Sequence, residues 1–302
     1  MELIKKQTHI DFMGKFKTAM VFSVLLILGG IVSIAMHGGL KYGIDFEGGT
    51  LVQLKFSEAP AIDSIRSSLK DIGFADSTIQ EFGTPDTILI RVERSDGELK
   101  EIGSRIKSTL EEKHGFTGII IERVEMVGPK VGKDLRMKAL LSILYAIIGI
   151  VIYISWRFEF QYAIAAIIAL IHDVLVTMGA FSVLDKEFTL VIVAAFLTII
   201  GYSLNDTIVV FDRIRENTRR KSKESLSDVI NTSINQTLSR TLLTSGTTLL
   251  VVVALFFLGG EIIHDFSFAL MVGVVIGTYS SIFIASVFLV YWESRAHPKK
   301  RA

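Results

Sequence analysis

Residues 201–217 read G-Y-S-L-N-D-T-I-V-V-F-D-R-I-R-E-N and place an acid, Asp206, beside Asn205 at the end of a long apolar run. An ionisable side chain at the centre of a membrane-spanning helix costs about 2.5–3.5 kcal/mol on insertion, so such a residue indicates a functional site. One interpretation makes Asp206 a protonation site within the membrane. The other makes it an interfacial acid that pairs with nearby arginines, and its position alone slightly favours this second one.

The apolar run belongs to residues 188–211, one of six charge-poor blocks in a chain of 302 residues that is 50% hydrophobic. A helix needs roughly 20 apolar residues to cross a bilayer, and the blocks are close to that length or longer. The sequence therefore predicts a polytopic α-helical membrane protein with six transmembrane helices. The predicted helices are residues 19–37, 137–157, 162–184, 188–211, 240–259 and 266–292.

Composition excludes several classes of function. The net charge of +1 leaves no footprint for nucleic acid, and the absence of cysteine excludes disulfides and thiolate metal sites. The sequence contains no phosphate-binding loop, no H-E-x-x-H zinc motif and no nucleophile elbow. We therefore expect no enzyme activity, no cofactor and no metal site. Any work that the protein performs would draw on an ion gradient.

Lysine and arginine gather in three segments, which are residues 1–18, 212–239 and 293–302. An even number of predicted helices separates these segments, so the preference of basic residues for the cytoplasmic side places all three in the cytoplasm. Residues 38–136 then lie outside. The first helix resembles a signal peptide, but residues 33–37 form a poor cleavage site, so we expect an uncleaved anchor.

The external segment 38–136 has the pattern of a small α+β domain. Alternating apolar residues indicate strands, and apolar residues at helical spacing indicate helices. This order of strands and helices predicts a ferredoxin-like sheet with helices on one face. The predicted strands are residues 50–56, 87–92 and 118–124, and the predicted helices are residues 61–69 and 99–110.

Two adjacent glycines, Gly48 and Gly49, precede the first predicted strand. Glycine permits positive φ and a sharp bend, so the pair could act as a hinge between the first span and the external domain. Taken alone, the pair favours a simple tight turn over any binding role.

Asp173 lies at the centre of the third span, beside His172 and far in sequence from any lysine or arginine. A carboxylate at that depth should face the protein interior or water. Asp173 could relay a proton or a cation, or it could be a structural acid bonded to another helix, and the sequence weighs these equally. A lone His172 is more often a packing or hydrogen-bonding residue.

Arg240 begins the fifth span and belongs to a polar stripe at the 3.6-residue period. Such a stripe is unfavourable against lipid, so it should face other helices or a wet path. Arg240 could instead only snorkel to the interface, and the hydroxyls could bond their own helix backbone. Arg240 with Asp206 would form an acid–base pair that switches with protonation. The stripe consists of Ser233, Gln236, Thr237, Arg240, Thr244, Thr247 and Thr248.

The sixth span carries a small residue at every fourth position. Such a ridge lets helix backbones approach closely, either within the chain or against a partner. We expect packing within the chain. The ridge consists of Ala269, Gly273, Gly277, Ser281 and Ala285.

Four segments in order along the chain resemble the SecF family, the six-span subunits of the bacterial Sec protein-export machinery. They are I-D-F-M-G-K at 10–15, Y-G-I-D-F-E-G-G-T at 42–50, H-D-V-L-V-T at 172–177, and residues 201–217. The resemblance covers essentially the whole chain. It places the chain in the SecD/SecF family of the resistance-nodulation-division superfamily and implies half of such a transporter.

The resemblance also implies a function. Family members pair with SecD in a complex that uses the proton-motive force to pull unfolded preproteins through the SecYEG channel of the inner membrane, and YajC is a further candidate partner. The acid matching Asp206 and the arginine matching Arg240 are implicated in ion coupling, with an acid contributed by SecD. Asp173 also lies in one of the matching segments, residues 172–177.

Two other classes remain as alternatives. A proton-driven half-transporter for small-molecule efflux shares the six-span plan, but efflux relatives generally have two large external domains and this chain has one. A non-catalytic scaffold of the translocon is the second alternative. It predicts that Asp206→Asn leaves export intact, whereas ion coupling predicts a loss of export.

Overall fold

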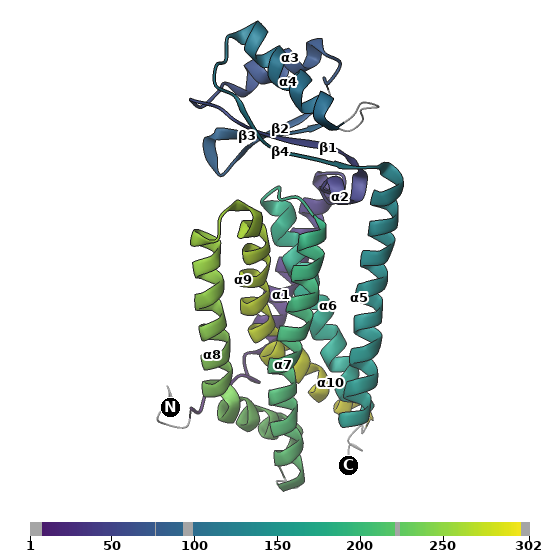
Figure 1. Cartoon of the computed structure of the whole chain (residues 1–302). Coiled ribbons are helices and arrows are strands. Elements are labelled where there is room, and N and C mark those ends of the chain that lie inside the picture. Colours follow the sequence, from purple (N-terminus) through teal and green to yellow (C-terminus); the bar gives the residue numbers. More distant parts are fainter. Residues whose placement is uncertain (1–7, 76, 93–98, 221–223, 297–302) are drawn as a thin grey trace. The chain divides into compact units, whose positions relative to one another are not determined.

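A computed structural model describes residues 8–75, 77–92, 99–220 and 224–296 (Figure 1). Within these residues, six helices are long and apolar enough to cross a membrane, which confirms the predicted six-span architecture. Residues 1–7 and 297–302 of the tails predicted at 1–18 and 293–302, and residues 221–223 of the link predicted at 212–239, lie outside the described residues. The spans are α1 (Phe16–Met36), α5 (Pro129–Arg157), α6 (Phe160–Val183), α7 (Leu190–Arg220), α8 (Leu226–Leu258) and the composite of α9 (Glu261–Ser280), η1 (Ser281–Ala285) and α10 (Ser286–Ala296).

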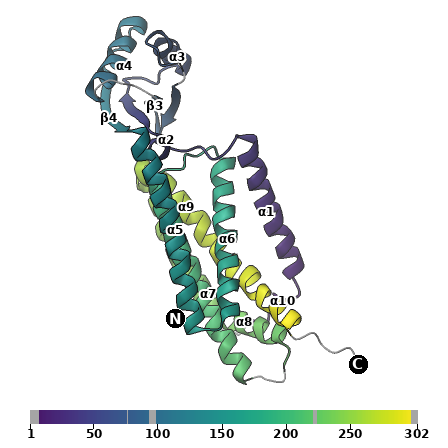
Figure 2. The ribbon, with the colours of Figure 1, turned by 90° about the vertical axis from the view of Figure 1, so that its right-hand side faces the viewer.

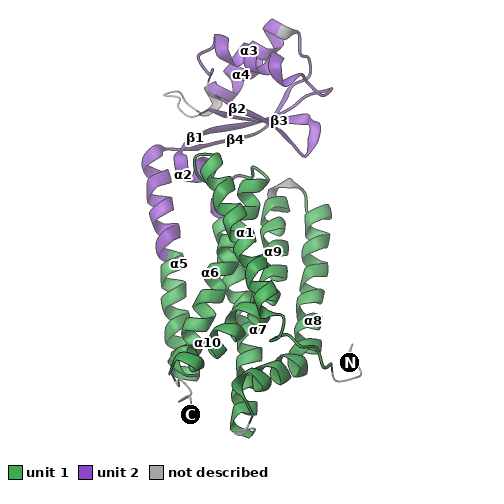
Figure 3. Cartoon of the chain, turned by 180° about the vertical axis from the view of Figure 1, so that it is seen from behind, with its two compact units in different colours: residues 1–41, 142–186, 191–302 green, residues 42–141, 187–190 purple. Residues whose placement is uncertain are grey.

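The chain forms two compact units (Figure 3). The helical unit comprises residues 1–41, 142–186 and 191–302, and the sheet unit comprises residues 42–141 and 187–190. Residues 187–190, which join α6 to α7, therefore belong to the sheet unit. The predicted helices 162–184 and 188–211 left only residues 185–187 between them and gave no sign of this attachment. The attachment depends on contacts with residues far away in sequence, which a local pattern cannot show.

The sheet unit contains a four-stranded antiparallel sheet in the order β2-β3-β1-β4. The chain order β-α-β-β-α-β is that of a ferredoxin-like unit. The prediction of three strands was wrong because it missed β2, in which only Ile79 is buried, so its apolar alternation is weak. The elements are α2 (Ile44–Glu47), β1 (Gly49–Lys55), α3 (Ile62–Asp71), β2 (Thr78–Phe82), β3 (Thr84–Val92), α4 (Leu99–His114) and β4 (Ile120–Val127).

The core of the sheet unit lies between one face of the sheet and the helices α3 and α4, which cover that face (Figure 1). Alternate residues of the central strands, such as Val52, Leu54 and Ile90, are completely buried. Ile65 of α3 and Ile106 of α4 meet them and are also completely buried. Because a fully buried aliphatic side chain contributes about 1.5–3 kcal/mol, this apolar layer holds the unit together.

The helical unit is built on close helix crossings at small residues. Figure 2 shows α1 beside α6, and a Cβ placed on Gly30 of α1 would lie only 2.7 Å from the Cα of Gly179 of α6. On α9, a Cβ on Gly273 would lie 2.4 Å from Ile199 Cγ1 of α7, and one on Gly277 would lie 2.9 Å from Ser203 Cβ. The small-residue ridge therefore packs within the chain, as predicted.

The sixth span contains a π-helical turn, η1, between α9 and α10. Within it, the Ser286 hydroxyl donates to the carbonyl of Ser281, five residues earlier, at 2.8 Å. Both side chains are completely buried. A π turn inside a helix is frequent at functional sites, and this one follows directly after Ser280.

Candidate functional site

Asp206 lies on α7 with 1% of its surface exposed. Its Oδ2 accepts a hydrogen bond from Ser245 Oγ of α8 at 2.8 Å. Thr278 Oγ1 of α9 lies 3.4 Å from the same Oδ2 and 2.7 Å from Ser245 Oγ. Three helices therefore meet at this carboxyl group through hydroxyl side chains.

Asp173 lies on α6 and is completely buried. Its Oδ2 accepts hydrogen bonds from Ser203 Oγ of α7 at 2.6 Å and Ser280 Oγ of α9 at 2.8 Å. Its Oδ1 lies 2.9 Å from His172 Nδ1. Asp173 is therefore hydrogen-bonded to two other helices, and its role, as a structural acid or as a relay, stays a prediction.

His172 extends the Asp173 network to α1. Its Nε2 lies 3.1 Å from Ser23 Oγ, which in turn lies 2.9 Å from Tyr279 OH. The Tyr279 hydroxyl donates to the carbonyl of Ala19 at 2.6 Å. Both ring nitrogens of His172 are therefore engaged, as expected for a hydrogen-bonding histidine in a buried position.

The two carboxyl groups share two helices. Ser203 and Asp206 are three residues apart on α7, and Thr278 and Ser280 are two apart on α9. Among the described residues, no lysine or arginine lies within ion-pair distance of Asp173 or Asp206. A hydroxyl group can donate to a carboxylate or accept from a carboxylic acid. The surroundings can therefore satisfy either protonation state of each acid.

Arg240 and Asn205 are not brought to the Asp206 carboxyl group. Both side chains are exposed in this chain, and the contacts of the described residues include no ion pair between Arg240 and Asp206. The switch pair predicted from sequence therefore stays a prediction.

The buried hydroxyl face of α8 shares Ser233 and Thr237 with the predicted stripe and then continues one residue round the helix from it, at Thr241 and Ser245. Thr244 and Thr247 of the predicted stripe donate to carbonyls of their own helix, at Arg240 and Leu243 respectively. Sequence reasoning missed Ser245, which contacts Asp206. A hydroxyl residue at every fourth position was the available signal. The buried face consists of Ser233, Thr237, Thr241 and Ser245.

Gly48 and Gly49 form the turn between α2 and β1. Both have positive φ, +80° and +121°, and a Cβ on Gly48 would lie 3.0 Å from the carbonyl oxygen of Val127. A side chain there would be strained in conformation and crowded by backbone. The tight-turn interpretation explains both glycines, and a hinge movement stays a prediction.

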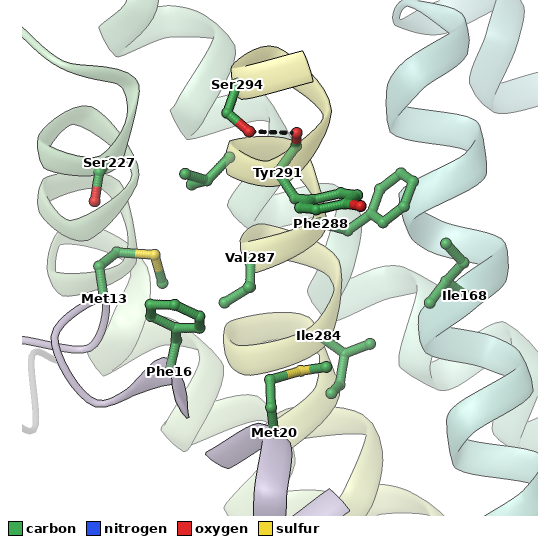
Figure 4. A pocket seen from close by; sticks show the side chains of 11 residues that line it. Met13, Phe16, Met20, Ile168, Ser227, Ile284, Val287, Phe288, Tyr291 and Ser294 are labelled. Atoms are coloured by element: carbon green, nitrogen blue, oxygen red, sulfur yellow. Dashed lines mark hydrogen bonds between the residues drawn. The ribbon is translucent and has the colours of Figure 1, made fainter. Parts of the chain in front are cut away.

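An apolar cavity of about 500 Å³ lies beside the start of α1 (Figure 4). None of its lining residues belongs to the Asp173 or Asp206 networks, so it is separate from the ionisable site. Among the described residues, no group of three or more His, Cys, Asp or Glu side chains could hold a metal ion. The lining includes Met13, Phe16, Met20, Ile284, Val287 and Phe288.

Comparison with known proteins identifies the family. The description "Protein export membrane protein SecD/SecF, C-terminal" matches residues 106–295, and the SecD/SecF GG motif matches residues 36–60. The protein translocase subunit SecF of Desulfurispirillum indicum is 50% identical over 293 residues, which cover 95% of this chain and 93% of that protein. The chain belongs to the SecD/SecF family. The SecF subunit of Vibrio alginolyticus is 45% identical and covers 94% of this chain and 90% of its own.

A solved structure of the SecD/SecF family has the same fold. The crystal structure of SecDF from Thermus thermophilus, a translocon-associated membrane protein, matches 98% of this chain with a TM-score of 0.86 and 35% identity. This chain spans 40% of that longer chain. The SecF relatives are named as subunits of a protein translocase, which is a transport component and not a catalytic enzyme.

Proposed function

We propose that this chain is a SecF subunit that, with SecD, uses the proton-motive force to drive late, ATP-independent steps of preprotein translocation through SecYEG. The names of its relatives support a translocase subunit over a small-molecule efflux half-transporter. The SecDF structure supports pairing with SecD. The distribution of lysine and arginine supports a place in the bacterial inner membrane with both termini in the cytoplasm.

The observation that carries this proposal is the all-hydroxyl environment of the Asp206 carboxyl group. Uptake of a proton removes a charge and reverses one hydrogen bond, because Asp206 then donates to a hydroxyl that previously donated to it. Ser245 and Thr278 couple this reversal to α8 and α9. One proton that crosses the membrane releases about 2.3 kcal/mol per 100 mV of membrane potential. This energy is enough to shift the equilibrium between two packing arrangements of the helices.

In this mechanism the remaining residues have separate roles. Although Arg240 is exposed in this structure, its side chain attracts the Asp206 carboxylate in one state of the cycle and releases it on protonation. Asp173 is a second protonatable group on the same pair of helices, α7 and α9. Tightly packed interfaces switch between discrete arrangements, so the α7–α9 interface repacks as a whole. In this proposal the repacking moves the segment that contains Gly48 and Gly49, and with it the external domain.

The experiment is preprotein export in cells depleted of their own SecF-family subunit and complemented by this chain at matched membrane levels. Asp206→Asn keeps the shape of the side chain but cannot carry the proton, and we expect export to fall about tenfold or more. Asp212→Asn is the matched control on the same helix, because Asp212 is exposed and pairs only loosely with Arg157 at 3.7 Å.

Normal export by Asp206→Asn would overturn ion coupling and favour a scaffold role. A sodium gradient is the alternative energy source for the same carboxyl group. Export measured with a proton ionophore and, separately, with a sodium ionophore distinguishes the two ions.

A further inference from the structure

The loop between α6 and α7 is bound to the segment that follows α1. Within the sheet unit, Tyr42 and Phe188 form a parallel β-bridge, and the amide of Gly43 donates to the Phe188 carbonyl at 3.0 Å. Asp45 Oδ2 accepts from the amide of Leu190 at 2.8 Å. Leu190 is the first residue of α7, so Asp45 satisfies one of the free amides at its N-terminus.

Aromatic rings reinforce this attachment. The ring centroids of Tyr42, Phe46 and Phe188 lie 5.9–6.2 Å from one another. Phe46 is 2% exposed. Contacts of this kind add specific geometry to apolar burial, so the loop has one preferred position against the segment.

A buried arginine of the sheet contacts both the segment that follows α1 and the loop between α6 and α7. Arg91 on β3 is 7% exposed, and its Nη1 donates to the Tyr42 carbonyl at 2.6 Å. Its Nη2 donates to Glu47, and its Nη1 lies 4.0 Å from Glu187 of the loop. A buried guanidinium with two carboxylate partners is sensitive to the loss of either.

Arg136 of α5 completes the arrangement. It donates to the Phe46 carbonyl at 3.3 Å, and its guanidinium carbon lies 4.4 Å from the centre of the Tyr42 ring. We call the whole set the Arg91 clamp. Its members are Tyr42, Asp45, Phe46, Glu47, Arg91, Arg136, Glu187 and Phe188.

We propose that the Arg91 clamp is the rigid link through which movement of α7 reaches the sheet unit. This inference rests on the proposed function. Helix α7 runs unbroken from Leu190 to Arg220 and carries Asp206, about 24 Å along the axis from Leu190 at 1.5 Å per residue. A continuous helix transmits displacement to its end, whereas a free loop would absorb it. The clamp ties that end to β3, an inner strand of the sheet.

The first test separates ion movement from export. We expect Arg91→Met to retain Asp206-dependent proton flux in membrane vesicles that contain the SecD partner, while export falls about tenfold because Glu47 and Glu187 lose the buried cation that they share. Arg91→Lys should keep most export. Arg123→Met is the control, since Arg123 forms a half-exposed pair with Glu125 on β4 of the same unit.

The outcomes distinguish this inference from the function on which it rests. If Asp206→Asn exports normally, the proposed function fails. If Asp206→Asn fails to export while Arg91→Met exports like the wild type, only the clamp inference is overturned. If Arg91→Met loses both proton flux and export at matched membrane levels, Arg91 has only a structural role. That result would also overturn the clamp inference.

The second test uses the absence of cysteine from the chain. A Cβ built on Gly43 lies 3.6 Å from the Cβ of Thr189, which suits a disulfide. We expect the pair Gly43→Cys and Thr189→Cys, once oxidised, to support export and to restore it in Arg91→Met, with the rescue lost on reduction. Each single cysteine variant is the control. If the disulfide instead blocks wild-type export, the link must open during the cycle and the proposal is wrong.

Discussion

At the scale of residues, the two intramembrane acids differ from ordinary buried carboxylates in what surrounds them. A buried acid held by arginine or lysine is fixed in its charged form, and loss of that form breaks the pair. Asp206 is held by serine and threonine hydroxyls instead, and Asp173 by two serine hydroxyls together with His172. Hydroxyls reorient at little cost, so these sites tolerate a change of protonation state, which a coupling site requires.

Ser245→Ala tests whether this hydroxyl environment matters. It removes the 2.8 Å hydrogen bond to Asp206, and a typical hydrogen bond is worth about 1 kcal/mol, so we expect export to fall about fivefold with little loss of protein. Thr247→Ala is the matched control, because the Thr247 hydroxyl bonds only its own helix. Equal export by the two variants would contradict the role of Ser245.

At the scale of elements, the position of the site depends on how closely α9 approaches α7. Gly273 and Gly277 meet Ile199 and Ser203 with no room for a side chain. This contact places Ser280 on Asp173 and Thr278 beside Asp206. The glycines therefore position the chemistry although they take no part in it.

Gly273→Val should disrupt that approach. The new side chain would collide with Ile199, and overpacking of a tight interface costs about 1–3 kcal/mol. We expect a lower midpoint of thermal unfolding in detergent and less protein in the membrane. Gly149→Ala on α5 is the control, because a Cβ there meets nothing within 4 Å. A midpoint unchanged by Gly273→Val would show that the interface is looser than the structure indicates.

Sequence patterns predicted these elements unevenly. Long apolar runs predicted all six spans, and the small-residue ridge predicted the packing of α9. The hydroxyl stripe of α8 coincides with the buried face at Ser233 and Thr237, but farther along it was assigned to Thr244 in place of Ser245, because periodicity cannot separate adjacent positions when both residues are polar. Strand β2 was missed for lack of buried residues, and the attachment of residues 187–190 was missed because it depends on Arg91, far away in sequence.

At the scale of the whole molecule, three of the six spans are left largely uncovered by the described part of this chain. The apolar windows of α1, α5 and α8 are only 22%, 11% and 17% buried, whereas those of the other three spans are at least half buried. Helix α8 carries both Ser245, which bonds Asp206, and the exposed Arg240. We expect the SecD partner to meet this face and to supply the acid that Arg240 lacks here.

Arg240→Ala distinguishes a residue that acts in the complex from one that stabilises the chain. The side chain is exposed and forms no ion pair among the described contacts, so its removal should change the free energy of unfolding by no more than about 0.5 kcal/mol. Export should nevertheless fall about tenfold, as expected when a desolvated interfacial charge loses its partner. The measurements are the unfolding midpoint of the purified chain and export at matched levels with SecD present. Arg213→Ala is the control, because Arg213 pairs with Glu216 at the helix surface and with no other acid in the described part of the chain. A lower midpoint with export reduced in proportion would make Arg240 a structural residue, and normal export would remove it from the coupling path.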